Sequence, residues 1–270
     1  AAEAERRETT WSLLDSPWDL LIIGGGITGA GILREAVRLG LKALLVEQRD
    51  FAWGTSSRSS KLVHGGLRYL KQGRIGLTRA AVSERERLLE DGPGLIDPLG
   101  FLLATYKGDR PGRWTYKAGL VVYDLLALRW SHRYYSLSEF EMLAPRVARD
   151  KLKGGFRYGD AQTDDARLVF RIIQEAIRAG GTALNYCSAD EMLYREGQVA
   201  GAWLRDQLSG RERAVYARAV VNATGAWADR LRAQVNGSPC IRPLRGSHLI
   251  FPAWRLPVAQ ALSFLHPTDR

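Results

Sequence analysis

The chain has 270 residues, 46% of them hydrophobic, and a formal net charge of +10. This length suits one large domain or two modest ones, and the hydrophobic content supports a packed core, which excludes a disordered chain. The positive charge would suit nucleic acid, an anionic membrane or an anionic substrate, but the sequence has no polybasic block and no zinc-finger, RNP-like or basic-helix pattern. We therefore expect no nucleic-acid partner.

The sequence contains no apolar run of the roughly 18 residues needed to span a bilayer, and its first residues lack the basic-then-apolar layout of a signal peptide. Its two cysteines, Cys187 and Cys240, belong to no CxxC or Cys/His cluster. This pattern argues against a disulfide framework or a zinc site, and we expect no metal. Together these features predict a cytoplasmic protein.

Near the N-terminus the sequence has a β-α-β pattern: the apolar run WDLLII, a glycine cluster, an amphipathic segment and a second apolar run, KALLVE. Gly24, Gly26 and Gly29 form a GxGxxG motif that contains Thr28, and Glu47 stands at the end of the second run. The glycines permit a tight turn, close approach to a pyrophosphate and close helix–strand packing, while the acid accepts from ribose hydroxyls. The spacing predicts a dinucleotide site without deciding between NAD and FAD.

The segment GTSSRSSKLVHGGLRYL, residues 54–70, follows this pattern and is dense in hydrogen-bond donors. Its first half has no continuous apolar face, so burying a core face cannot be its only purpose. We expect it to hold a ligand.

Helical periodicity recurs in LTRAAVSERERLLE and YKAGLVVYDLLALRW, and TDDARLVFRIIQEAIRAGG has acidic residues at its start and glycines at its end. In SLSEFEMLAP, Ser138 and Glu141 have the spacing of a capping box. The residues from Thr182 to Ala217 read as short strands joined by the turns REGQ and QLSG. The second half therefore adds strands to an α/β frame.

A second strand-to-helix turn helps to choose the nucleotide. In AVVNATGAWADRL an apolar strand leads through Ala223, Thr224 and Gly225 into a helix. Small residues there would let another strand end approach an elongated cofactor, although an ordinary turn would also use a glycine. Together with the GxGxxG motif, this feature favours FAD.

Several blocks in this order, DLLIIGGGITGAG, LVEQRDFAWGTSSRSSKLVHGGLRYL, TDDARLV, VNATGAWAD and LRGSHLIFP, resemble the FAD-dependent glycerol-3-phosphate dehydrogenases. The run SSKLVHGGLRYL is the most specific part, because related flavin amine oxidases share the nucleotide motif but generally lack this run. The resemblance implies an α/β fold with a glutathione-reductase-like FAD-binding Rossmann domain and an inserted, partly present substrate domain. It also implies oxidation of sn-glycerol 3-phosphate to dihydroxyacetone phosphate.

The resemblance gives the donor-rich segment a role in holding FAD. Hydroxyls and amides there would satisfy pyrophosphate, ribityl and flavin-edge acceptors, and one lysine would add charge near the cofactor. The cofactor-binding residues that we expect are Gly24, Gly26, Thr28, Gly29, Glu47, Thr55, Ser56, Ser59, Ser60, Lys61, His64, Gly65, Gly66, Ala223, Thr224 and Gly225.

The end of the same segment is expected to meet the isoalloxazine ring and the substrate. Gly65 and Gly66 would leave room for the ring, and His64 would contact it and is a candidate general base, because histidine titrates near neutral pH. By analogy with the family, Arg68 would bind the substrate phosphate, since a guanidinium makes bidentate charge-assisted bonds. Tyr69 would be its neighbour in the substrate site.

The expected reaction is hydride transfer from C2 of glycerol 3-phosphate to flavin N5, with electrons passed on to quinone. The motifs do not separate this dehydrogenase from an oxidase that uses oxygen. A flavin amine oxidase and a non-catalytic FAD-binding fragment also stay open. An anionic membrane surface, contacted peripherally, and a homodimer are further options for its partners.

The resemblance also suggests a division of the chain into segments and an incomplete substrate domain. Family members are usually longer, and the resemblance stops in SFLHPTDR, so we expect a fragment or a truncated product. The expected segments are an N-terminal extension (1–16), the first part of the FAD-binding domain (17–110), a helical and strand insertion (111–160), the remainder of the FAD-binding domain (161–238) and the start of a truncated substrate domain (239–270).

Overall fold

The computed structural model describes residues 2–263. These residues form two compact units: unit 1 comprises those up to Ser59 together with Asp164–Ser247, and unit 2 comprises Ser60–Thr163 together with those from His248 onward. The chain passes between the units inside the donor-rich segment 54–70. These bounds differ from the five segments predicted above, and the functional roles of those segments stay a prediction.

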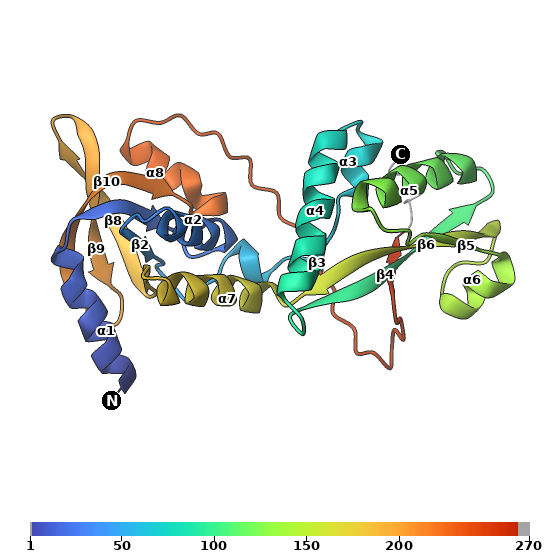
Figure 1. Cartoon of the computed structure of the whole chain (residues 1–270), viewed down its shortest axis with the longest axis horizontal. Helices are drawn as coiled ribbons and strands as arrows, with labels where there is room; N and C mark the ends of the chain where they lie inside the picture. The colour runs from blue at the N-terminus through green and yellow to red at the C-terminus, as the bar shows by residue number, and fades with distance from the viewer. Residues whose placement is uncertain (1, 264–270) are drawn as a thin grey trace. The chain divides into compact units, whose positions relative to one another are not determined.

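Unit 1 is built on a six-stranded sheet with the order β7-β2-β1-β10-β9-β8 (Figure 1). The first four strands are parallel, and the last two extend the sheet in antiparallel pairing. Its strands are β1 (Trp18–Ile23), β2 (Ala43–Val46), β7 (Thr182–Leu184), β8 (Cys187–Arg195), β9 (Gln198–Asp206) and β10 (Glu212–Asn222). Its helices and 3-10 turns are α1 (Ala2–Ser12), η1 (Leu13–Asp15), α2 (Ile27–Arg38), η2 (Thr55–Ser57), α7 (Asp165–Arg178), η3 (Gly225–Trp227) and α8 (Ala228–Gln234).

The core of unit 1 follows from its hydrophobic pattern. All four residues of β2 are buried, as expected for a parallel strand covered on both faces. On one face, Leu33 of α2 and Ile173 of α7 pack with Ile22 and Leu45 of the sheet in one cluster. This arrangement confirms the predicted α/β fold and places the glycine motif where β1 passes into α2.

The first 16 residues, predicted as an extension, contribute to the core of unit 1. Trp11 of α1 and Leu14 of η1 are buried in the cluster on the other face of the sheet. Arg7 donates to a carboxylate oxygen of Asp206 at 2.6 Å and to the carbonyl of Asn185 at 3.0 Å. These contacts dock α1 on the ends of the antiparallel strands.

Unit 2 has a sheet with the order β11-β4-β6-β3, and β5 also pairs with β6 (Figure 1). Its strands are β3 (Leu62–Val63), β4 (Ile96–Tyr106), β5 (Arg133–Tyr135), β6 (Leu152–Thr163) and β11 (Ala261–Ser263). Its helices are α3 (Leu67–Lys71), α4 (Ile75–Asp91), α5 (Arg113–Ala127) and α6 (Leu137–Leu143). Among residues 2–263, no helix is both long enough and apolar enough to cross a membrane.

One detail of the sequence prediction was wrong. The capping box of α6 uses Ser136 and Glu139, not Ser138 and Glu141: the Ser136 amide donates to Glu139 Oε2 at 2.8 Å. Both pairs have the required spacing. The difference arises because β5 ends at Tyr135, so the helix begins two residues earlier than the pattern alone suggests.

Candidate functional site

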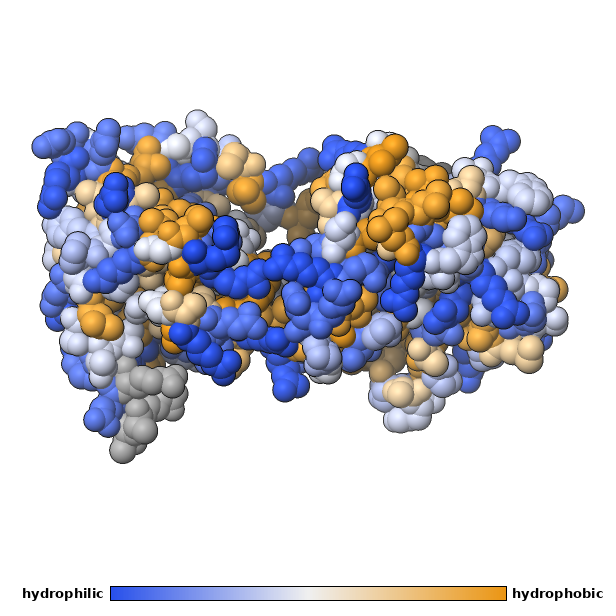
Figure 2. Space-filling model, viewed as in Figure 1, coloured by the Kyte–Doolittle hydropathy of each residue, from blue (hydrophilic) through white to orange (hydrophobic). Residues whose placement is uncertain are grey.

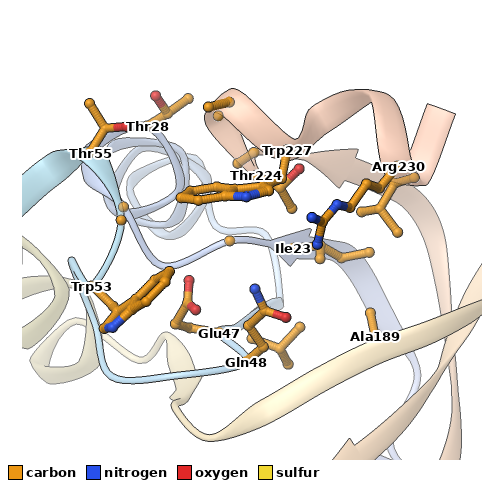
Figure 3. Close-up of a pocket in the computed structure, with 18 of the residues that line it drawn as sticks. Ile23, Thr28, Glu47, Gln48, Trp53, Thr55, Ala189, Thr224, Trp227 and Arg230 are labelled. Atoms are coloured by element: carbon orange, nitrogen blue, oxygen red, sulfur yellow. The ribbon is translucent and has the colours of Figure 1, made fainter. Parts of the chain in front are cut away.

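A cavity of about 620 Å³ lies in unit 1 where β1, β2 and β10 end (Figure 3). The carboxyl ends of neighbouring parallel strands are the usual place for a ligand in an open α/β sheet. Many of the predicted cofactor residues line this cavity: Gly24, Gly26, Thr28, Glu47, Thr55, Ser56, Ala223, Thr224 and Gly225. The structure therefore brings together the glycine motif, the start of the donor-rich segment and the second strand-to-helix turn.

The glycines at the β1–α2 turn are required by close backbone packing. Gly24 has φ +116°, and a Cβ there would lie 2.5 Å from the carbonyl oxygen of Ala223. A Cβ on Gly29 would overlap the carbonyl oxygen of Gly24. Gly29 does not line the cavity, but it allows α2 to start close to β1, which agrees with the packing role expected for the third glycine.

Two amides of the glycine loop donate hydrogen bonds to neighbouring segments, one to a strand and one to a side chain. The Gly24 amide donates to the carbonyl of Val46 at 2.8 Å, and the Ile27 amide donates to Ser56 Oγ at 2.9 Å. Within residues 2–263, the amides of Thr28 and Gly29 have no hydrogen-bond acceptor. These first-turn donors of α2 are therefore available to an anion, and the helix dipole adds to the attraction.

Glu47 is half-buried beside the same loop. One carboxylate oxygen accepts from the Gly25 amide at 2.8 Å, and the other accepts from the Arg49 amide at 2.9 Å. Each oxygen keeps a further lone pair, so the carboxylate can also accept from two hydroxyl groups. Free amides on one side and an oriented carboxylate on the other fit the pyrophosphate and ribose of a dinucleotide.

The cavity has further lining residues that the sequence analysis missed. Trp53 and Trp227 face the cavity with ring centroids 5.9 Å apart, and the side chain of Arg230 extends into it from α8 (Figure 3). The guanidinium groups of Arg49 and Arg58 lie 4.1 Å and 4.8 Å from the Trp53 ring centroid. The sequence feature that could have identified Trp53 is the position of this tryptophan two residues before the polar run TSSRSS.

Ser59 and its two successors lie elsewhere. Ser59 Oγ donates to a carboxylate oxygen of Asp165 at 2.7 Å, and its amide donates to the same oxygen at 3.1 Å. This pair ties the end of the unit 1 segment to the start of α7. Ser60 and Lys61 are exposed residues of unit 2, and neither lines the cavity. Their cofactor roles stay predictions.

The remaining predicted residues, from His64 to Tyr69, also belong to unit 2. His64 is exposed, and its ring centroid lies 6.4 Å from that of Tyr69. A Cβ on Gly65 would overlap the hydroxyl of Tyr123, so protein packing by itself already requires a glycine there. Arg68 belongs to α3, but its side chain lies outside what the structure describes.

Comparisons with known proteins identify the family of the chain. Residues 19–270 match the family model described as FAD dependent oxidoreductase. The chain is 43% identical to the aerobic glycerol-3-phosphate dehydrogenase of Bacillus subtilis over 98% of its length, and 40% identical to that of Staphylococcus aureus strain USA300 over 96%. It spans about half of these relatives, 49% and 48% of their lengths. The resemblance inferred from the motifs is thus confirmed.

Solved structures show the same fold. The glycerol-3-phosphate dehydrogenase from Bacillus halodurans, complexed with FAD, has a TM-score of 0.75 and 32% identity, over 98% of this chain and 46% of that one. L-proline dehydrogenase from P. horikoshii has a TM-score of 0.64 at 18% identity, over 82% of this chain and 56% of that one, which supports the fold alone. With the family match over most of its length, the chain belongs to the FAD dependent oxidoreductase family.

Proposed function

We propose that this chain supplies the FAD-binding part of a dehydrogenase that oxidises sn-glycerol 3-phosphate to dihydroxyacetone phosphate. The observation that carries the proposal is the cavity at the ends of β1, β2 and β10, where free helix amides stand beside an oriented carboxylate. The identity of 43% to a glycerol-3-phosphate dehydrogenase supports the choice of substrate.

The residues of unit 1 have distinct tasks in this proposal. The amides of Thr28 and Gly29 bind the pyrophosphate, and Glu47 accepts from the ribose hydroxyls. Thr55 and Ser56 donate to the cofactor from the loop after β2, and the small residues from Ala223 to Gly225 let the backbone approach it. Once bound, FAD supplies a hydride acceptor, N5, for the hydrogen on C2 of the substrate.

The residues of unit 2 serve the substrate end. Arg68 binds the phosphate, because a guanidinium pairs with two phosphate oxygens at once, and Tyr69 lies one residue further along α3. His64 is the candidate base that takes the hydroxyl proton as the hydride leaves C2. Lys61, Gly65 and Gly66 complete the cofactor contacts of this segment.

The test uses the full-length protein. Denaturation should release a flavin with the mass of FAD. Under anaerobic conditions, glycerol 3-phosphate should bleach the visible absorption of the oxidised flavin. Recovery of NAD, or of no nucleotide after reconstitution, would contradict the proposal. Bleaching by an amine substrate instead would identify an amine oxidase, and a flavin that no substrate reduces would identify a non-catalytic FAD-binding protein.

The electron acceptor is proposed to be a quinone, reached from an anionic membrane surface. On the face shown in Figure 2, apolar side chains gather over α5, whose Trp114 and Leu125 are exposed. The basic residues Arg113 and Lys117 stand on the same helix. Exposed apolar groups beside cations suit a lipid surface that carries negative charge.

Two measurements on the full-length protein separate the acceptors. We expect salt-sensitive binding to anionic liposomes, weakened by a Lys117→Glu change, and faster reduction of a quinone analogue than of oxygen. Rapid peroxide formation without liposome binding would identify an oxidase.

A further inference from the structure

The donor-rich segment is held to β6 by a side chain where β3 ends. The carbonyl of Lys61 accepts from the Thr163 amide at 2.9 Å, and β3 pairs with the next residues back along β6. The following contact comes from the Gly65 amide, which donates to Oδ1 of Asp160 at 2.9 Å. The Asp160 carboxylate therefore takes the place of a backbone acceptor and fixes the chain at the turn.

Asp160 itself belongs to a buried polar network. The Arg85 guanidinium donates to the same oxygen at 2.8 Å, and the Tyr123 hydroxyl donates to it at 3.2 Å. Arg85 also donates to the Tyr123 hydroxyl at 2.8 Å. The Arg85 and Asp160 side chains are only 5% and 3% exposed. Burial, together with the Asp160 charge, raises the pKa of Tyr123, so the phenol stays a neutral donor.

The turn that the network holds has little freedom to move. A Cβ on Gly65 would overlap the Tyr123 hydroxyl and would lie 2.6 Å from a methyl group of Val82. Gly66 has φ +77°, a conformation that favours glycine, and α3 begins directly after it. The backbone therefore packs closely against the network at Gly65 and changes direction at Gly66.

Stability alone does not require such a network, because apolar groups of similar volume often replace buried ion pairs without loss. What the network does is fix the backbone at Gly65. In the sequence this residue follows the exposed His64 and precedes Tyr69 of α3. We propose that Arg85, Tyr123 and Asp160 are positioning residues for the segment from His64 to Tyr69. This rests on the proposed function, which assigns the segment to flavin and substrate.

The first arm of the test reads the turn directly and needs no substrate. Asp160→Asn keeps the shape of the side chain but replaces a charged acceptor by a neutral one. In the FAD-loaded full-length protein, hydrogen exchange of the Gly65 amide should become about tenfold faster or more, as expected when a charge-assisted bond is weakened. Tyr123→Phe, a milder change, should shift the same amide in the same direction if Asp160→Asn fails to fold.

The second arm measures catalysis beside a matched control. Asp124 is the residue next to Tyr123 on α5 and is equally buried, but its carboxylate accepts from Ser131 and His132 and makes no bond to Gly65. Tyr123→Phe and Asp160→Asn should retain FAD, alter the visible circular dichroism of the flavin and lower kcat/KM for glycerol 3-phosphate about 10- to 100-fold, since small misplacements are costly. Asp124→Asn should lower the melting temperature yet change kcat/KM less than about threefold.

The outcomes separate the inference from the proposed function. Unchanged hydrogen exchange of the Gly65 amide overturns the inference, whatever the activity. A loss of kcat/KM that parallels the loss of melting temperature in all three variants overturns it as well. Faster exchange at Gly65 in a protein that does not oxidise glycerol 3-phosphate supports the hold on the turn and overturns the proposed function instead.

Discussion

Ser56 Oγ accepts the amide hydrogen of Ile27 at 2.9 Å, which joins the donor-rich segment to the first turn of α2. A Cβ on Gly26 would lie 3.0 Å from the same oxygen. Because this hydroxyl accepts from the helix, its own hydrogen remains available to a bound anion. Ser56 can therefore both cap α2 and donate to a pyrophosphate.

The first prediction follows from this double role. Ser56→Ala should weaken FAD binding about tenfold, because it removes one donor to the anion and a cap of the helix. Flavin fluorescence titration of the apoprotein measures the affinity. Ser57→Ala is the control, since the Ser57 hydroxyl bonds to the carbonyls of Trp53 and Gly54 and does not line the cavity. Equal FAD affinity in the two variants would remove Ser56 from the cofactor site.

Two glycines of α2 should respond oppositely to the same change. A Cβ on Gly29 would overlap the Gly24 carbonyl oxygen, whereas a Cβ on Gly31 would meet no atom within 4 Å. Gly29→Ala should therefore lower the free energy of unfolding by about 2 kcal/mol or more, as overpacking of a tight contact does. Gly31→Ala should raise it by about 0.5 to 1 kcal/mol, since alanine favours the helix interior. Chemical denaturation measures both, and similar effects at the two positions would contradict the packing described here.

Arg68→Ala in the full-length protein tests the proposed contact with the substrate phosphate. The change should lower kcat/KM for glycerol 3-phosphate roughly ten- to a hundredfold, because a charge-assisted bond contributes about 1.5 to 3 kcal/mol. FAD content should stay near normal, and Arg68→Lys should recover only part of the loss, because a point charge cannot reproduce the planar fork. If FAD is lost together with activity, Arg68 is a cofactor or structural residue.

Acid should destabilise unit 1 through the Arg7–Asp206 pair that docks α1. Burial would raise the pKa of Asp206, but hydrogen bonds from Arg7, Ser209 and the Leu208 amide outweigh it and lower that pKa to about 2. A lowered folded-state pKa stabilises the protein above the ordinary value of 3.8, and the stabilisation, about 2 kcal/mol, disappears as pH falls towards 2. The free energy of unfolding measured in urea melts should therefore fall between pH 6 and pH 3, and Arg7→Gln should remove most of that fall. An unchanged pH dependence in Arg7→Gln would show that the pair is not responsible.

The two free cysteines should differ sharply in reactivity. Burial raises the pKa of the Cys187 thiol to about 12, whereas Cys240 is exposed. Because the thiolate is the reactive form, a thiol reagent at pH 8 should modify Cys240 quickly and Cys187 only after unfolding. Cys240→Ser should abolish the fast phase. Persistence of that phase in Cys240→Ser would mean that the environment of Cys187 opens in solution.

The sequence by itself determined the β1-α2-β2 unit, because apolar period, glycine spacing and the acid at the end of β2 are all local features. Adjacent residues could not decide the register of the α6 cap, since SLSEFE contains two matching pairs and the end of β5 selects one. Only the tertiary structure decided which distant groups meet. Trp227 lies beside Trp53 in the cavity, and the Gly65 amide donates to Asp160, which is 95 positions further along the chain. Neither pair has a local pattern, because sheet pairing and core packing, not sequence spacing, bring such side chains together.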